Sequence, residues 1–384
     1  MDATPIANVL VHFQNADSSL VASMMTDATG TASALMAAGG FVTAINPWGA
    51  TNTFEIDTYA SVKPGDHLVL HKQTATFYDV SITPLFDGTT GATNYQFYST
   101  CSFAQGNLLI APQAIAPPTP SSVQMNNCGT SADTLLATTD MTSTFLDFIY
   151  APAQAVASGG SIDFTGKTYT AAPGRSLTIT NNPMPTAQLQ ITDALAVTGG
   201  LLLQQVVSAT GSPATQSVNV PSIATATSID STSYRGAFAT NGLIEWAPYS
   251  TSYSSDLGSK LLGDFATAPL FDQPTHTIKW TAAAGVTPEF VVGAIQAHRL
   301  SNDVFWNWYV AAPSATSIAY PVLPTVPFDY NVGSADVVGV LSLSAATVPG
   351  GYDAVRSTIL STSVSSFVAG PSGSIAVQTL FPPG

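Results

Sequence analysis

Short runs of apolar residues, several alternating with polar ones, recur along the first 60 positions of the chain. Each run has the length of a β-strand and is bounded by Gly, Asp, Asn or Pro. The runs are VLVHF, LVASMM, TASALM, FVTAI and TFEIDTY, at residues 9–13, 20–25, 31–36, 41–45 and 53–59. This spacing predicts consecutive strands joined by tight turns.

Similar runs continue to the end of the chain, and we predict an all-β protein with two or three β-sandwich domains in tandem, Ig-like or jelly-roll-like. We expect a first sandwich at 5–62, a second β-rich region at 63–184, and a C-terminal sandwich with long loops at 185–384. Two short pieces look helical instead, Ser254 to Phe265 and Tyr352 to Leu360.

The low content of charged residues agrees with exposed β-strands, and the net negative charge excludes one class of binding partner. Charged residues are 8% of the chain, against about 25% in typical soluble domains. Nine Lys and Arg face 23 Asp and Glu, which gives a formal net charge of -14. A chain this acidic repels phosphate backbones, so we expect no nucleic-acid partner. No apolar run approaches the length of a membrane-spanning helix, and we expect no transmembrane segment.

Cys101 and Cys128 are the two cysteines of the chain, and we predict that they form a disulfide. The bridge would bracket and tie down a Pro-rich segment, Ile110 to Ser122, which cannot be a central strand. The first residues have neither a basic nor an apolar signal-peptide region. We therefore expect an extracellular or cell-surface protein whose leader has been removed.

The hairpins of Phe13 to Pro47, with the turn Thr26-Asp27-Ala28-Thr29-Gly30, carry a resemblance to a known family. This part resembles the carboxypeptidase regulatory-like, or transthyretin-like, sandwich. That resemblance implies a seven-stranded, non-catalytic accessory domain. The whole chain resembles uncharacterised exported β-rich proteins of Gram-negative soil bacteria, which implies location and fold and adds nothing about chemistry.

The pentad from Phe305 to Tyr309 is the richest aromatic segment. On a strand, Trp306 and Trp308 share one face, while Phe305, Asn307 and Tyr309 share the other. One face must be core, and the other either contacts a neighbouring domain or stacks on a sugar ring. The candidate ligand-binding residues are Trp306, Trp308, Phe305 and Tyr309, with Asn302 and Asp303 for hydroxyl groups.

We find no local catalytic signature and expect neither an enzyme nor a cofactor. Histidines 67 and 71 with His12 would suit a metal on one sheet face, but two His four apart on a strand are about 13 Å apart, so we expect separate histidines. A structural Ca²⁺ held by turn aspartates is a further hypothesis. A hydrolase would need two carboxylates to converge, for example from Glu245, Glu289 or Asp272.

Three functional hypotheses follow. The leading one is a non-enzymatic surface protein that binds a glycan or another surface protein. The second is a self-assembling structural subunit of a filament, surface layer or capsid-like shell, because low charge and Thr- and Ala-rich surfaces favour self-association. The third is a secreted hydrolase.

Overall fold

The computed structural model describes residues 6–47, 52–68, 78–88, 92, 94–103, 113–115, 122–140, 144–182, 185–186, 188–197, 200–235, 239–248, 252–258, 260, 262, 267–281, 287–313, 316–348, 350–356 and 373–380. The chain is all-β with several sheets, as predicted. In these residues the helical elements are α1 (Gly351–Arg356), η1 (Thr100–Phe103) and η2 (Gln273–Thr275).

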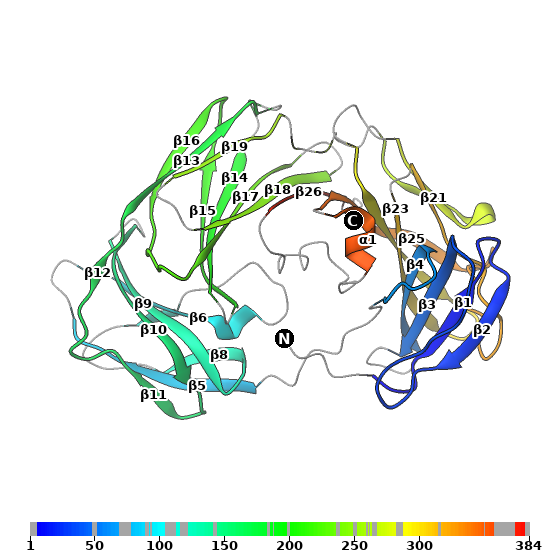
Figure 1. Cartoon of the computed structure of the whole chain (residues 1–384), viewed down its shortest axis with the longest axis horizontal. Helices are drawn as coiled ribbons and strands as arrows, with labels where there is room; N and C mark the ends of the chain where they lie inside the picture. Colours follow the sequence, from blue (N-terminus) through cyan, green and yellow to red (C-terminus); the bar gives the residue numbers. More distant parts are fainter. Residues whose placement is uncertain are drawn as a thin grey trace.

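In the described part of the chain, the largest sheet has 12 strands. Their order is β15 (Gly200–Ala209), β14 (Leu189–Val197), β17 (Thr227–Arg235), β18 (Ala239–Pro248), β26 (Gly373–Leu380), β25 (Val337–Thr347), β22 (Phe290–Arg299), β23 (Val304–Pro313), β4 (Thr53–Val62), β3 (Gly40–Pro47), β1 (Leu10–Gln14) and β2 (Leu20–Met25). Figure 1 shows this long sheet passing from one half of the molecule to the other through β18 and β26.

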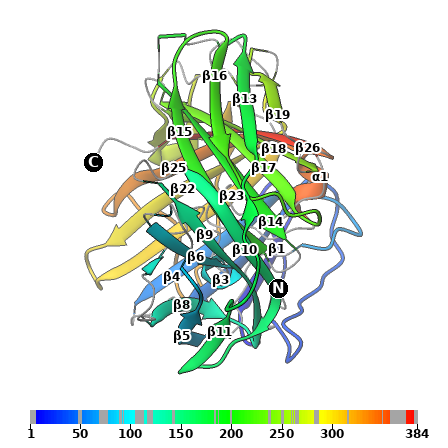
Figure 2. The ribbon, with the colours of Figure 1, turned by 90° about the vertical axis from the view of Figure 1, so that its left-hand side faces the viewer.

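Four smaller sheets accompany it in the described residues. The five-stranded one is β12 (Thr170–Ala171), β10 (Phe145–Ala155), β9 (Ser131–Thr139), β6 (Asn94–Ser99) and β7 (Gln113–Ile115). The three-stranded ones are β11 (Gly160–Asp163), β5 (Tyr78–Leu85) and β8 (Val123–Cys128); β16 (Ala214–Asn219), β13 (Gly174–Thr180) and β19 (Ser252–Asp256); and β20 (Leu270–Asp272), β21 (Thr277–Lys279) and β24 (Ser317–Ala319). In Figure 2, β13, β16 and β19 lie together at the top and β5, β8 and β11 at the bottom.

The strands of the first 60 residues show where the hydrophobic pattern succeeds and where it fails. Four of the five predicted runs form β1, β2, β3 and β4. The run at 31–36 forms no strand, although its alternation is real: Ala32, Ala34 and Met36 pack against the core while Ser33 and Leu35 are exposed. Alternate side chains are therefore partly buried there although the segment is not part of a β-strand.

The pairing of β4 with β23 is parallel and joins the start of the chain to its last third. The domain boundary at 62 stays a prediction. The pairing of β4 with β23 joins residues on the two sides of this boundary. The transthyretin-like character of residues 5–62 is not confirmed. Residues 252–256, part of which looked helical, form strand β19, whereas α1 begins one residue before Tyr352, where a helix was expected.

The predicted disulfide between Cys101 and Cys128 is confirmed. Both cysteines are buried in an apolar cluster that includes Phe97, Met125 and Phe164. Within the Pro-rich segment, Gln113–Ile115 forms β7 at the edge of the five-stranded sheet, while 110–112 and 116–121 lie outside the described residues. The bridge thus fastens η1 to the end of β8.

Candidate functional site

Strands β22 and β23 form the hairpin that carries the predicted ligand residues, and its alternation is as expected. Trp306 and Trp308 point to one face of the long sheet and have no exposed surface. Phe305 points to the other face and is 38% exposed. Tyr309, further along that second face, is buried in the core, which corrects its prediction as a ligand-binding residue. The turn between the strands leaves Asn302 and Asp303 exposed.

Both tryptophans are core residues, which corrects the interpretation that they stack on a ligand. The indole N–H of Trp308 donates to the hydroxyl of Thr58 at 2.9 Å. The guanidinium of Arg299 lies over the ring of Trp306, 5.2 Å from its centroid. The small sheet with β21 and β24 covers this face so closely that a Cβ on Gly293 would lie 2.8 Å from Ile318. A sugar ring cannot reach either indole.

On the opposite face, the strands β25, β22 and β23 bring three side chains into one row. Val337 lies opposite His298, and His298 lies opposite Phe305. The rings of His298 and Phe305 stack with centroids 3.6 Å apart and 14° between their planes. The Nε2 atom of His298 lies 3.0 Å from Oδ1 of Asp303. Asp303 takes a left-handed φ of 54°, a conformation that Asp tolerates better than most residues.

A second row runs beside the first, one pleat further along the strands. It consists of Gly339, Gln296, Asn307 and Glu55 on β25, β22, β23 and β4. The side-chain amide of Gln296 donates to Oδ1 of Asn307 at 3.2 Å. A Cβ added to Gly339 would meet no atom within 4 Å, so the strip above this glycine is open. We call the residues Val337, Gly339, Gln296, His298, Asp303, Phe305 and Asn307 the His298–Phe305 surface.

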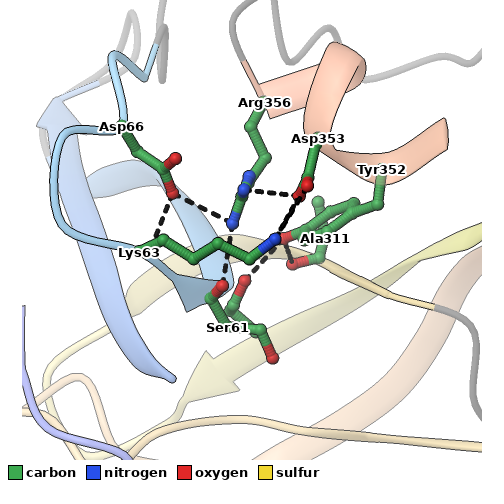
Figure 3. A network of polar contacts seen from close by, with 8 residues as sticks. Ser61, Lys63, Asp66, Ala311, Tyr352, Asp353 and Arg356 are labelled. Atoms are coloured by element: carbon green, nitrogen blue, oxygen red, sulfur yellow. Dashed lines mark hydrogen bonds and ion pairs between the residues drawn. The ribbon is translucent and has the colours of Figure 1, made fainter. Parts of the chain in front are cut away.

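The same sheet face is closed further along the strands by helix α1. The hydroxyl of Tyr352 lies 2.7 Å from the carbonyl oxygen of Ala60 and 2.8 Å from that of Ala311 (Figure 3). Arg356 is buried, and its guanidinium donates to the carbonyl of Ser61 and pairs with Asp66 at 2.9 Å and Asp353 at 2.5 Å. These contacts fix α1 over the sheet. One end of the face is therefore core and the other end is open.

The residues that sequence reasoning missed are His298, Gln296, Gly339 and Val337. The sequence did contain a signal for two of them, His298 and Gln296. The segment Leu300 to Asp303 is a short polar interruption between two strand-like runs, which is typical of a hairpin. A hairpin there places His298 opposite Phe305 and Gln296 opposite Asn307. The partner β25 comes from further along the chain and has no such local signal.

The histidines considered for a metal do not share one site. His12 is buried, its Nδ1 lies 2.7 Å from the hydroxyl of Ser23, and burial lowers its pKa. His67 is exposed beside a groove of about 590 Å³ lined by Val11 and Phe13, which alternate with His12 and point to the other side of β1. His71 lies outside the described residues. Nowhere in the described ranges do three or more His, Cys, Asp or Glu group in a way that could hold a metal ion.

The carboxylates considered for hydrolysis each have their own partner. Glu245 pairs with Lys260 at 2.5 Å, Asp272 pairs with Lys279 at 2.5 Å, and Glu289 accepts a hydrogen bond from the backbone of Val348 at 2.9 Å. Among the described residues, no hydrogen bond or ion pair joins any two of these three acids. The turn aspartates Asp27 and Asp163 accept hydrogen bonds from backbone N–H groups of their own turns; calcium binding stays a prediction.

A buried charge cluster joins β13 to the long sheet. The guanidinium of Arg175 contacts the carboxylates of Asp193 and Asp230, which are opposite one another on β14 and β17. Arg175 also donates to Ser228 at 2.8 Å. Burial raises the pKa of Asp193 to about 7, with a further increase from the charge of Asp230 and an opposing effect of Arg175. The cluster lies in the interior and packs two sheets together.

No known protein family and no curated protein matches the chain. Among solved structures, a partial similarity is found to the crystal structure of the shaft pilin spaA from Lactobacillus rhamnosus GG, with 10% identity and a TM-score of 0.18. It covers 55% of this chain and 100% of that chain, and a score this low does not indicate a common fold. Across the described residues, no helix has the length and hydropathy required to cross a membrane.

Proposed function

We propose that the chain is a non-enzymatic protein of the cell exterior that binds a carbohydrate on the His298–Phe305 surface. The observation that carries this proposal is the exposed ring of Phe305, stacked on His298 next to an open strip of sheet. The buried disulfide suits an oxidising compartment outside the cytosol.

The chemistry of the surface matches a sugar better than a purely apolar ligand. A pyranose has an apolar C–H side, which packs on an aromatic ring, and a rim of hydroxyl groups, which both donate and accept. Phe305 supplies the ring, and Gln296 and Asn307 supply amide donors and acceptors one row away. The carboxylate of Asp303, whose side chain is mostly exposed, can accept from a hydroxyl. A lipid tail would leave these polar groups without partners.

The shape of the surface also favours an extended ligand. The two rows cross at least three adjacent strands, and neighbouring strands in a sheet are about 4.8 Å apart. A chain of two or three sugar units laid across the rows would contact β25, β22 and β23 together. We therefore propose an oligosaccharide or polysaccharide rather than a free monosaccharide.

A screen of immobilised glycans tests this function with three proteins. The wild-type chain is expected to bind one class of glycan, and Gly339→Thr is expected to lose that signal because a side chain fills the open strip. Gly129→Thr is the matched control, since Gly129 is also exposed and has space around it, in the connection between β8 and β9. Equal binding by all three proteins, or no glycan bound by the wild type, contradicts the proposal.

A further inference from the structure

The outer edge of β2 is the end of the long sheet on the side of the N-terminal strands (Figure 1). Among the described residues, its strand partner is β1 alone. Every second N–H and C=O group of β2 therefore points away from the sheet, where it can pair with another extended chain.

The side chains of β2 do nothing to block such pairing. Its sequence, LVASMM, contains no charge and no proline, two of the devices that protect an edge strand. The β-bulge that β2 does contain lies at its first residues, where Phe13 is paired with Ala22 but Gln14 with Leu20. Leu20 is 49% exposed and Met25 is 53% exposed. An uncharged edge with large exposed apolar side chains is unusual in a protein that stays monomeric.

From these observations we infer that β2 pairs antiparallel with β2 of a second copy of this chain. The net charge of -14 makes two copies repel one another, so an interface forms most readily where each copy has no charge. Strand β2 meets that condition against itself. The edge at the other end of the sheet, β15, lies beside η1 and β6 and is less accessible.

The alternation of β2 restricts how two copies can align. Residues directly opposite in an antiparallel pair share a face, so a strand that pairs with itself must be centred on one residue. With Ser23 at the centre, Ala22 lies opposite Met24 of the other copy, and Val21 lies opposite Met25. Ala22 and Met24 already pack on the apolar core of β1 and β3, and this alignment continues that core across the twofold axis. Because this twofold pairing uses the same free strand edge of both copies, it produces a dimer and does not continue into a longer assembly.

Light scattering after size exclusion tests the proposal on the full chain, over about 10 µM to 1 mM, a range suited to a small interface. We expect the protein to be a monomer at low concentration and a dimer at high concentration. Added salt should lower the concentration at which the dimer forms, because it screens the repulsion between the two negatively charged copies. Met25→Lys is expected to remain monomeric throughout. The control Leu270→Lys adds the same charge at another exposed apolar position and should still dimerise. A wild-type monomer over the whole range, or a Met25→Lys dimer of unchanged affinity, overturns the proposal.

A cross-linking experiment tests the alignment separately. In the double variant Val21→Cys/Met25→Cys, the new cysteines of one chain are too far apart to bond to each other, being four residues apart on a strand. The native cysteines are already bonded to one another. Oxidation should then give a covalent dimer, at the concentrations where the wild type is dimeric. A dimer in light scattering that yields no covalent product contradicts the pairing through β2.

Discussion

The indole N–H of Trp308 donates to the hydroxyl of Thr58, 250 positions earlier in the chain, and both side chains are fully buried. The Thr58 hydroxyl also bonds the hydroxyl of Thr43 at 2.9 Å. Replacing Thr58 with Val keeps its shape and leaves two buried polar groups without their partner. We expect the free energy of unfolding to fall by about 2 to 3 kcal/mol in Thr58→Val.

Chemical denaturation measures this loss, with Thr325→Val as a control at an exposed loop position. The control should change stability by less than about 0.5 kcal/mol. Because Thr58 and Trp308 lie on neighbouring strands, tryptophan fluorescence and circular dichroism should report the loss together. A Thr58→Val protein as stable as the wild type shows that the hydrogen bond contributes nothing.

We expect the disulfide to stabilise the two smaller sheets built from β5 to β12 as a unit. Replacing both cysteines, in Cys101→Ala/Cys128→Ala, should lower the stability of this unit by about 3 to 4 kcal/mol. The five tryptophans, at positions 48, 246, 280, 306 and 308, all lie outside it. We expect the variant to lose circular dichroism in an early thermal transition that tryptophan fluorescence does not follow. Coincident transitions by both probes would mean that the chain unfolds as one unit.

The contacts of α1 allow a buried and an exposed interaction to be compared in one place (Figure 3). Tyr352→Phe removes a buried hydroxyl from the carbonyls of Ala60 and Ala311 and should cost about 1 to 2 kcal/mol. Lys63→Met breaks the ion pair with Asp353, in which both side chains are more than half exposed, and should cost less than about 1 kcal/mol. Chemical denaturation measures the unfolding free energy of both variants. A larger decrease in Lys63→Met than in Tyr352→Phe contradicts the view that the buried hydrogen bonds contribute more than the exposed ion pair.

The pKa of Asp193 makes stability depend on pH. In the folded protein this pKa is raised to about 7, against about 4 in an unfolded chain. Between these values the folded state holds a proton that the unfolded state has lost. The free energy of unfolding should therefore decrease as the pH rises from about 4 to about 7, and level off above that.

Asp193→Asn removes this titration while keeping a neutral side chain beside Arg175. The difference in unfolding free energy between about pH 5 and about pH 8 should be smaller in this variant than in the wild type. Asp17→Asn, at an exposed turn, should retain the wild-type difference. If the difference is the same in all three proteins, Asp193 does not take up the proton.

Local patterns predicted the strands better than their partners. Runs such as 9–13 and 41–45 became β1 and β3 because alternation describes a half-buried strand wherever its neighbours come from. The parallel pairing of β4 with β23 and the pairing of β18 with β26 each join residues more than 100 positions apart in the sequence. No local signal specifies such pairs.

The candidate site was predicted in part for the same reason. Strand alternation correctly divided the pentad, with Trp306 and Trp308 on one face and Phe305 on the other, but it could not say which face is covered. Tyr330 packs on Trp306 and Tyr320 packs on Trp308, which buries both tryptophans, and the open face carries Phe305 with His298. Ligand binding by Phe305, Asn302 and Asp303 stays a prediction.

The most direct test of carbohydrate binding is the dissociation constant of the best glycan from the screen, measured by isothermal titration calorimetry with wild type, Phe305→Ala and Val206→Ala. Val206 is an exposed apolar residue on β15, far along the sheet. We predict that Phe305→Ala weakens binding about 10- to 100-fold, since loss of one aromatic contact costs about 1 to 3 kcal/mol, and that Val206→Ala binds like the wild type. Unchanged affinity in Phe305→Ala would contradict a carbohydrate site on the His298–Phe305 surface.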